Sequence, residues 1–259
     1  MKEKIYTIPV MEAFREDCEC PLCLLEKKLE DEYVDYVLGP SLMEPDGREE
    51  TNEKGFCRRH YELVFKRQSN KLGLALILDT HLAEQNKKLK NLFDSSISAL
   101  KGATATSPLK NLFGKSSSRQ TSAGHPVDQL VSALDDLEHK CAVCSKLDYT
   151  MDRYVDVIFY LWSKEKDFKD LFNSKKGFCL KHLKLLLSGA KKYLRQQNEL
   201  SEFVVKTLEM QQENMERIQQ EVNWFTKKFD YRYNDAPWGN SKDSVSRSIQ
   251  KLAGHLDLK

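Results

Sequence analysis

The sequence predicts an all-α fold of two duplicated helical units with long helices, joined by a flexible linker. Apolar residues recur at intervals of three and four over long stretches, which is the period of one helix face. Only 7 proline and 11 glycine residues occur among 259, so the chain has few residues that end regular elements. In addition, one pattern is written twice, and each copy has the order helix, loop, helix, long helix.

Each copy of the repeat contains three blocks in the same order. A CxxC block comes first, a Tyr-Val-Asp block begins ten residues after its second cysteine, and a Gly-Phe-Cys-x-x-His block follows. The gap between the inner cysteines is 33 residues in one copy and 34 in the other. The repeated cysteines and histidines are Cys20, Cys23, Cys57 and His60, and then Cys141, Cys144, Cys179 and His182.

The elements of the first copy follow from its apolar spacing. Leu22, Leu25 and Leu29 lie on one face of a helix that ends at Gly39-Pro40. An acidic, turn-rich loop leads to Gly55. A further helix is expected to begin near residue 57 and to continue to about residue 100, with a possible interruption at residue 73.

The second copy has a longer helix after its CxxH block, with a heptad-like pattern broken by one polar residue. Its members are Val204, Leu208, Gln211, Met215, Ile218, Val222, Phe225 and Phe229. Such a stripe either packs inside the protein or joins two copies of the chain, so a homodimer through the 200–229 helix is possible.

These elements divide the chain into four expected parts. Residues 1–101 form the first helical unit, 102–126 a flexible linker rich in glycine, serine and threonine, and 127–229 the second unit. Residues 230–259 are an aromatic C-terminal segment with a short helix from about Lys242 to Gly254, capped by Ser241. This segment either folds back on the helices or offers a patch to a partner.

The duplicated cysteines and histidines point to zinc. Zinc prefers four tetrahedral thiolate and imidazole ligands, and residues three apart on a helix share a face. We expect each copy to supply one site, so that the first site is Cys20, Cys23, Cys57 and His60. The second is then Cys141, Cys144, Cys179 and His182. Four protein ligands leave no open position, which favours two structural zinc ions per chain. Buried thiols, an iron–sulfur cluster and a redox pair are the alternatives.

Neighbouring residues fit a metal site with surplus negative charge. Arg58, Arg59 and Lys181 lie inside the CxxH blocks, where they either offset that charge or contact nucleic acid. Asp35 and Asp156 are either partners of the ligand histidines or ordinary helix-surface residues. A spare thiol, Cys18, precedes the first CxxC, and the remaining histidines are expected to be ordinary. They are His81, His125, His139 and His255.

Several classes of function are disfavoured. The net charge of +2 is close to neutral and does not by itself indicate nucleic-acid binding. No phosphate-binding loop, dinucleotide fingerprint, serine-hydrolase elbow or HExxH occurs, and no catalytic residue is nominated. No signal peptide or apolar run of about 20 residues is present, so we expect a cytoplasmic location without a membrane partner. In a reducing compartment, cysteines at regular spacing indicate metal ligands.

The CPxC and GFCxxH blocks, with the FDYR and WGNSKD segments near the end, resemble an uncharacterised bacterial family. The resemblance runs from Cys20 to about Leu252 and implies a helical metal-binding protein of unknown function. Members sometimes carry an automatic label as ABC-transporter substrate-binding proteins, which this sequence does not support because it lacks an alternating α/β pattern. The second copy departs from CPxC, with Ala142 where the first has Pro21.

The sequence therefore favours a non-enzymatic scaffold or adaptor that presents helical surfaces to an unidentified protein partner. One alternative is a thiol- or metal-responsive sensor. Another is a nucleic-acid-binding protein that uses the basic helices beside the metal sites.

Overall fold

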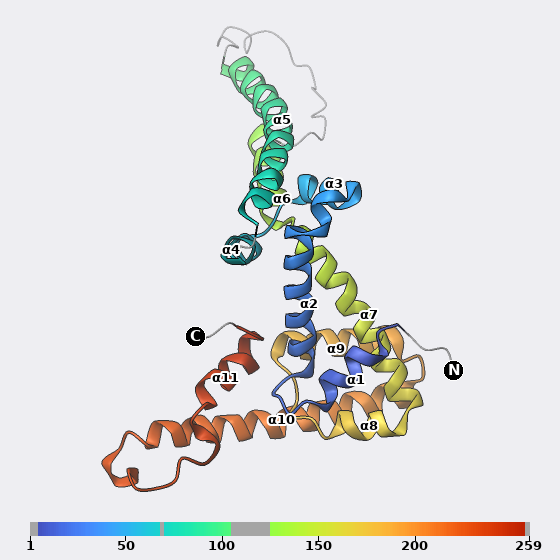
Figure 1. Cartoon of the computed structure of the whole chain (residues 1–259), viewed down its shortest axis with the longest axis vertical. Coiled ribbons are helices and arrows are strands. Elements are labelled where there is room, and N and C mark those ends of the chain that lie inside the picture. Colours follow the sequence, from blue (N-terminus) through green and yellow to red (C-terminus); the bar gives the residue numbers. More distant parts are fainter. Residues whose placement is uncertain (1–4, 68–69, 105–124, 257–259) are drawn as a thin grey trace, which may run out of the picture. The chain divides into compact units, whose positions relative to one another are not determined.

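The structure is a computed structural model of the chain and describes residues 5–67, 70–104 and 125–256. Within these ranges every regular element is an α-helix or a short 3-10 helix, and no strand occurs (Figure 1). The predicted all-α fold is confirmed. Across the described ranges, no helix is long and apolar enough to cross a membrane.

The chain divides into two compact units that do not follow the order of the repeat. Unit 1 comprises Met1–Asp31 and Leu147–Lys259, and unit 2 comprises Glu32–Lys146. The expected units at 1–101 and 127–229 therefore differ from the units observed, since each observed unit takes residues from both copies. The expected linker includes residues 105–124, which lie outside the described residues.

Unit 2 is built from helices around a small apolar core. Its complete elements are η1 (Pro40–Met43), α3 (Pro45–Lys54), α4 (Arg58–Arg67), α5 (Lys71–Thr104) and α6 (Pro126–His139). It also holds the last residues of α2 (Pro21–Leu38) and the first residues of α7 (Ala142–Lys164). The core contains Val34, Leu38 and Val64. Helix α5 packs against both α3 and α6.

The segment before Gly55 is helical rather than the expected loop. Pro45 begins α3, because proline suits the first helical position, and Gly55 ends it with a φ of 57°. The break in the expected long helix lies upstream of Gly73, where the side chain of Asn70 accepts from the Gly73 amide at 2.8 Å and caps α5.

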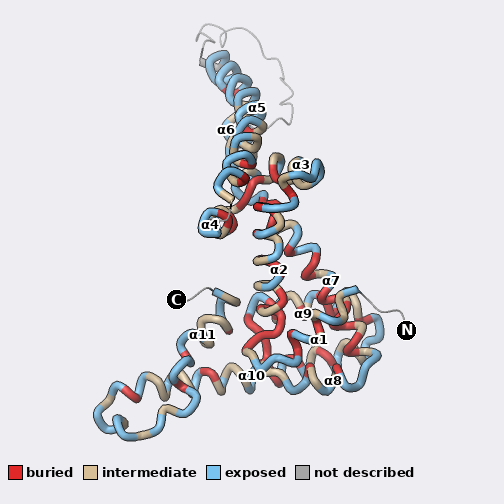
Figure 2. Tube along the Cα trace, viewed as in Figure 1, coloured by how far each residue is buried: buried red, intermediate tan, exposed pale blue. Residues whose placement is uncertain are grey.

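Unit 1 has the larger core, and aromatic rings fill it. Its complete helices are α1 (Thr7–Arg15), α8 (Lys166–Asn173), α9 (Leu180–Tyr193), α10 (Gln197–Lys227), η3 (Tyr231–Tyr233), η4 (Gly239–Ser241) and α11 (Ser244–Ala253). The most deeply buried rings are Phe14, Phe159, Phe168, Phe172, Phe178 and Phe203. Figure 2 shows the buried positions on the facing sides of α1, α7, α8, α9 and α10.

Helix α10 packs inside unit 1 with a face that is displaced from the predicted heptad stripe. Gln211 and Ile218 are buried as the stripe requires, but Leu208 is 46% exposed and Phe229 is 75% exposed. The buried face instead includes Phe203 and Thr207. The buried face differs from the predicted stripe because polar residues such as Thr207 also face the core, and a pattern of apolar residues alone does not include them.

The aromatic C-terminal segment folds back on the end of α10. Trp224 Nε1 donates to the Pro237 carbonyl at 3.0 Å. The buried Lys228 ammonium donates to backbone oxygens of the returning chain, those of Tyr233, Asn234 and Ala236. The expected short helix is α11, but Ser241 does not cap it. Its hydroxyl donates to the carbonyl of Trp238, the residue before η4, and Asp243 takes the N-cap position of α11.

Candidate metal centres

The structure gathers the eight repeated cysteines and histidines into two clusters, but the expected grouping is wrong. The first centre, in unit 1, consists of Cys20, Cys23, Cys179 and His182. The second centre, in unit 2, consists of Cys57, His60, Cys141 and Cys144. Each CxxC therefore meets the CxxH of the other copy rather than its own.

Helix length explains why a copy does not close its own site. The CxxC at Cys20 and Cys23 lies at the start of α2, which is 18 residues long. At 1.5 Å per residue this helix is about 27 Å long, and it ends before the Gly-Phe-Cys-x-x-His block begins. The segment that follows is also helical, in η1 and α3, and Cys57 after it meets Cys141 and Cys144. The same holds in the second copy, where α7 is 23 residues long.

The first centre has the geometry of a single tetrahedral ion. Nδ1 of His182 lies 3.5, 3.4 and 3.2 Å from the Sγ atoms of Cys20, Cys23 and Cys179. The Sγ atoms of Cys23 and Cys179 are 3.7 Å apart. Zinc bonds of about 2.3 Å to sulfur and about 2.0 Å to nitrogen imply S–S separations of about 3.8 Å and S–N separations of about 3.5 Å. All four ligand residues are buried.

The second centre repeats this arrangement. His60 Nδ1 lies 3.2, 3.2 and 3.3 Å from the Sγ atoms of Cys57, Cys141 and Cys144. The Sγ atoms of Cys57 and Cys144 are 3.8 Å apart. A backbone hydrogen bond from Ala142 to the Gly55 carbonyl, 3.0 Å long, joins the two copies beside the ligands. In each centre the donor atoms lie within 4.8 Å of one another, which suits one ion rather than a multi-iron cluster.

The ionisation of the thiols also fits a cation. Contact with Cys144 lowers the pKa of the Cys141 thiol to about 3, and the same contact raises the pKa of Cys144 above its usual range. Contacts with Cys20 and Cys23 lower the pKa of Cys179, whereas burial raises the pKa of Cys20. Thiolates this close repel one another, so they do not all ionise by themselves. A divalent cation would stabilise them together.

Each CxxH block is positioned by a glycine turn and by the long helix that follows. Gly177 has a φ of +79°, and a side chain there would lie 2.7 Å from Oε1 of Gln211. The Gln211 side chain accepts from the Phe178 amide at 2.8 Å and donates to the Phe178 carbonyl at 3.0 Å. Gln211, which breaks the heptad pattern, therefore holds the backbone next to Cys179. The only sequence feature that marked Gln211 was its polar side chain in an otherwise apolar stripe.

The second centre has a similar support from α5. Gly55 has a φ of +57°, and a side chain there would lie 2.5 Å from the ring of His81. His81 Nδ1 donates to the Asn52 carbonyl at 2.8 Å, and Gln85 Nε2 donates to the same carbonyl at 3.3 Å. His81, expected to be ordinary, therefore supports the turn that leads to Cys57.

The replacement Gln211→Met should destabilise unit 1. It keeps most of the side-chain volume but leaves the Phe178 amide and carbonyl without their partners. Each buried polar group left without a hydrogen bond lowers the free energy of unfolding by about 1–3 kcal/mol. We expect a clear fall in the urea midpoint of unfolding measured by circular dichroism. The matched control is Gln212→Met at the next, exposed position, where Gln212 contacts only Glu216 in the described contacts. Equal midpoints for the two variants would contradict this role.

A carboxylate lies on the far side of the first ligand histidine. Glu26 Oε2 is 3.4 Å from His182 Nε2, and Lys181 pairs with the other oxygen of the same carboxylate. Burial opposes the charged form of Glu26, but the contacts with His182 and Lys181 outweigh it and lower its pKa. Glu26 is therefore the acidic neighbour of the ring nitrogen of His182 that faces away from the thiols, the place where a carboxylate orients a metal-binding histidine. Its position one helical turn after Cys23 was the available signal in the sequence.

Of the two aspartates considered for this role, Asp35 has a different partner. Asp35 accepts from Arg67 Nε at 2.8 Å within unit 2. Asp156 is a half-buried residue of α7. In the second copy the position that matches Glu26 is occupied by Leu147. The two centres therefore differ in the residue that follows the CxxC by one turn.

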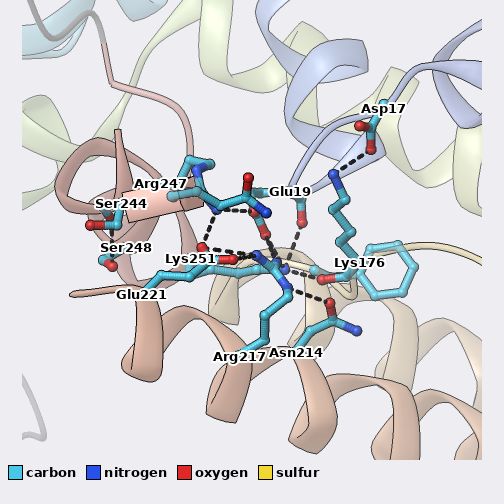
Figure 3. A network of polar contacts seen from close by, with 12 residues as sticks. Asp17, Glu19, Lys176, Asn214, Arg217, Glu221, Ser244, Arg247, Ser248 and Lys251 are labelled. Carbon is cyan, nitrogen blue, oxygen red and sulfur yellow. Dashed lines mark hydrogen bonds and ion pairs between the residues drawn. The ribbon is translucent and has the colours of Figure 1, made fainter. Parts of the chain in front are cut away.

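A network of charged side chains meets at Glu19, next to the first centre in the sequence (Figure 3). The carboxylate of Glu19, the residue before Cys20, pairs with Arg217 at 2.6 Å and Arg247 at 3.1 Å. Lys251 on α11 is fully buried, and its Nζ lies 3.2 Å from the same carboxylate. Burial opposes the ionised form of Glu19, yet these cations outweigh it and lower its pKa.

Lys251 also ties together the two segments that carry the ligands. Its ammonium donates to the Glu19 carbonyl at 2.8 Å and to the Lys176 carbonyl. Glu19 precedes the CxxC and Lys176 precedes the Gly-Phe-Cys turn, so one buried cation joins both sides of the centre. Among the cations considered in the sequence, Arg58 and Arg59 are exposed. No sequence pattern indicated Lys251, because its contacts join it to residues 75 and 232 positions away in the chain.

The fold and the centres define an all-helical protein with two candidate metal sites, each made of three cysteines and one histidine. The whole chain, residues 1–259, matches the family of unknown function DUF6062, and the protein belongs to that family. No curated protein and no solved structure shows detectable similarity to it.

Proposed function

We propose that the protein binds two zinc ions and that these ions hold its helices together as a non-enzymatic scaffold. The observation that carries this proposal is the convergence of four zinc-type donors at each centre from distant segments. Cys20 and His182 are 162 residues apart, and His60 and Cys141 are 81 apart. Bringing such segments together costs conformational entropy, which a structural zinc ion can offset.

The donor sets favour a structural role for the metal. Each centre supplies four protein ligands, which completes the tetrahedral shell of zinc and leaves no position for a substrate. Apolar side chains exposed on the α5–α6 pair support the scaffold role, since exposed apolar surface is a feature of protein contacts. They are Leu82, Phe93, Ile97, Leu100, Val127, Val131 and Leu134. We propose that these helices meet a protein partner.

Metal analysis tests the proposal directly. We expect native mass spectrometry of the purified protein to show two zinc ions per chain, with no visible absorption band of the kind an iron–sulfur cluster gives. Structural zinc contributes about 10–16 kcal/mol, which exceeds or matches the about 5–15 kcal/mol net stability of a typical domain. A strong chelator should therefore abolish most of the helical circular dichroism, and added zinc should restore it. Full helicity in metal-free protein would contradict a structural role.

A further inference from the structure

The two centres are covered to different extents. In the first, the thiols and the histidine are all fully buried. Helix α11 seals it: Lys251 lies beneath the surface, and a side chain at Gly254 would lie 3.8 Å from the Cys179 sulfur. Solvent and small oxidants therefore have no direct access to these sulfurs.

The second centre is open at two of its four ligands. His60 and Cys141 are 2% exposed, but Cys57 and Cys144 are only half-buried. The exposed Arg58 follows Cys57 directly. Metal-bound thiolates remain nucleophilic, and the oxidation of cysteine follows thiolate character and exposure. The two sulfurs that meet both conditions are adjacent, at 3.8 Å.

We propose that the second centre is an oxidant-responsive site, at which hydrogen peroxide oxidises Cys57 and Cys144 to a disulfide and the metal is released. This inference rests on the proposed metal binding. The thiolate of one cysteine attacks the peroxide, the O–O bond breaks, and a sulfenic acid and one water form after uptake of a proton. The second thiolate attacks the sulfenic sulfur, forms the S–S bond and expels hydroxide, which takes up the second proton. The two thiolates lose two electrons in total, and hydrogen peroxide gains them as it becomes two waters.

The metal leaves because the remaining ligands do not hold it. After oxidation only Cys141 and His60 can donate, and zinc in proteins is held by three or four such ligands. The sulfurs have to approach from 3.8 Å to about 2.05 Å, a closure that departure of the ion permits. Within unit 2 the new bond would join the residue before α4 to the first turn of α7, so the oxidised form stays cross-linked while His60 is freed.

The test compares zinc release from the two centres of the intact protein. Protein that holds two zinc ions is treated with hydrogen peroxide, and released zinc is followed with a chromogenic chelator. We expect one zinc per chain to leave about tenfold or more faster than the other, as the difference in thiolate exposure requires. Peptide mapping without reduction should then find a Cys57–Cys144 disulfide after the fast phase.

Matched variants assign the phases. Cys57→Ser should abolish the fast phase, and Cys23→Ser, which removes a ligand of the covered centre, should retain it. Mapping of the wild-type protein decides the matter even if a variant fails to fold. Equal release rates, or a first disulfide between any other pair, including Cys141–Cys144 and Cys18–Cys20, would overturn the inference. Fewer than two zinc ions at the start would contradict the proposed function as well, whereas two ions with equal release contradict the oxidation site alone.

Discussion

Replacing Cys20 and Cys179 together should remove one zinc ion per chain, whereas replacing Cys20 and Cys57 together should remove both. The first pair belongs to one centre and the second pair to different centres. If each copy closed its own site, the two results would be reversed, so these double variants test the grouping directly. The measurement is zinc per chain by native mass spectrometry, with serine at each replaced cysteine.

The same variants should differ in which unit unfolds. Loss of the first centre removes about 10 kcal/mol or more from unit 1, so hydrogen exchange should accelerate in α8, α9 and α10. The amides of α3 and α4 in unit 2 should keep their protection. Cys18→Ser is the control, because Cys18 belongs to neither cluster and should leave the metal content at two. Equal exchange in both units after loss of the first centre would show that the units do not fold separately.

Two fragments, residues 1–114 and 115–259, should form a stable complex when they are expressed together. The first fragment supplies the CxxC of the first centre and the CxxH of the second, and the other fragment supplies the complementary pairs. Each fragment alone has two ligands for each ion, so neither should hold zinc tightly or fold fully. Size-exclusion chromatography and metal analysis of the co-expressed pair provide the measurement.

Chelation provides the control for the split protein. Removal of zinc should separate the fragments, because both centres join one fragment to the other, and serine at Cys20 and Cys57 together should prevent their association. Two fragments that each fold and bind one zinc ion independently would contradict the observed grouping. The helicity and the zinc content of the complex are compared with those of the intact chain.

The sequence determined the class of fold and the eight cysteines and histidines that form the candidate metal centres. A helical period in the apolar residues is local, and it predicted most helices, including α2 and α10. The repeated CxxC and CxxH spacings are also local, since residues three apart share a helix face whatever lies around them. Helix α3 begins at Pro45, but the polar composition of residues 45–54 predicts a loop.

The tertiary structure decided which donors meet. Two groupings are compatible with the same eight residues, and the choice depends on contacts between segments 81 and 162 residues apart. The lengths of α2 and α7 contribute to this choice, because each places a long rigid helix between the CxxC and the CxxH block of its own copy. Long-range packing likewise placed Glu26 behind His182 and the buried Lys251 beside the first centre. It left Cys57 and Cys144 half-buried, a difference between the centres that two nearly identical sequence motifs do not contain.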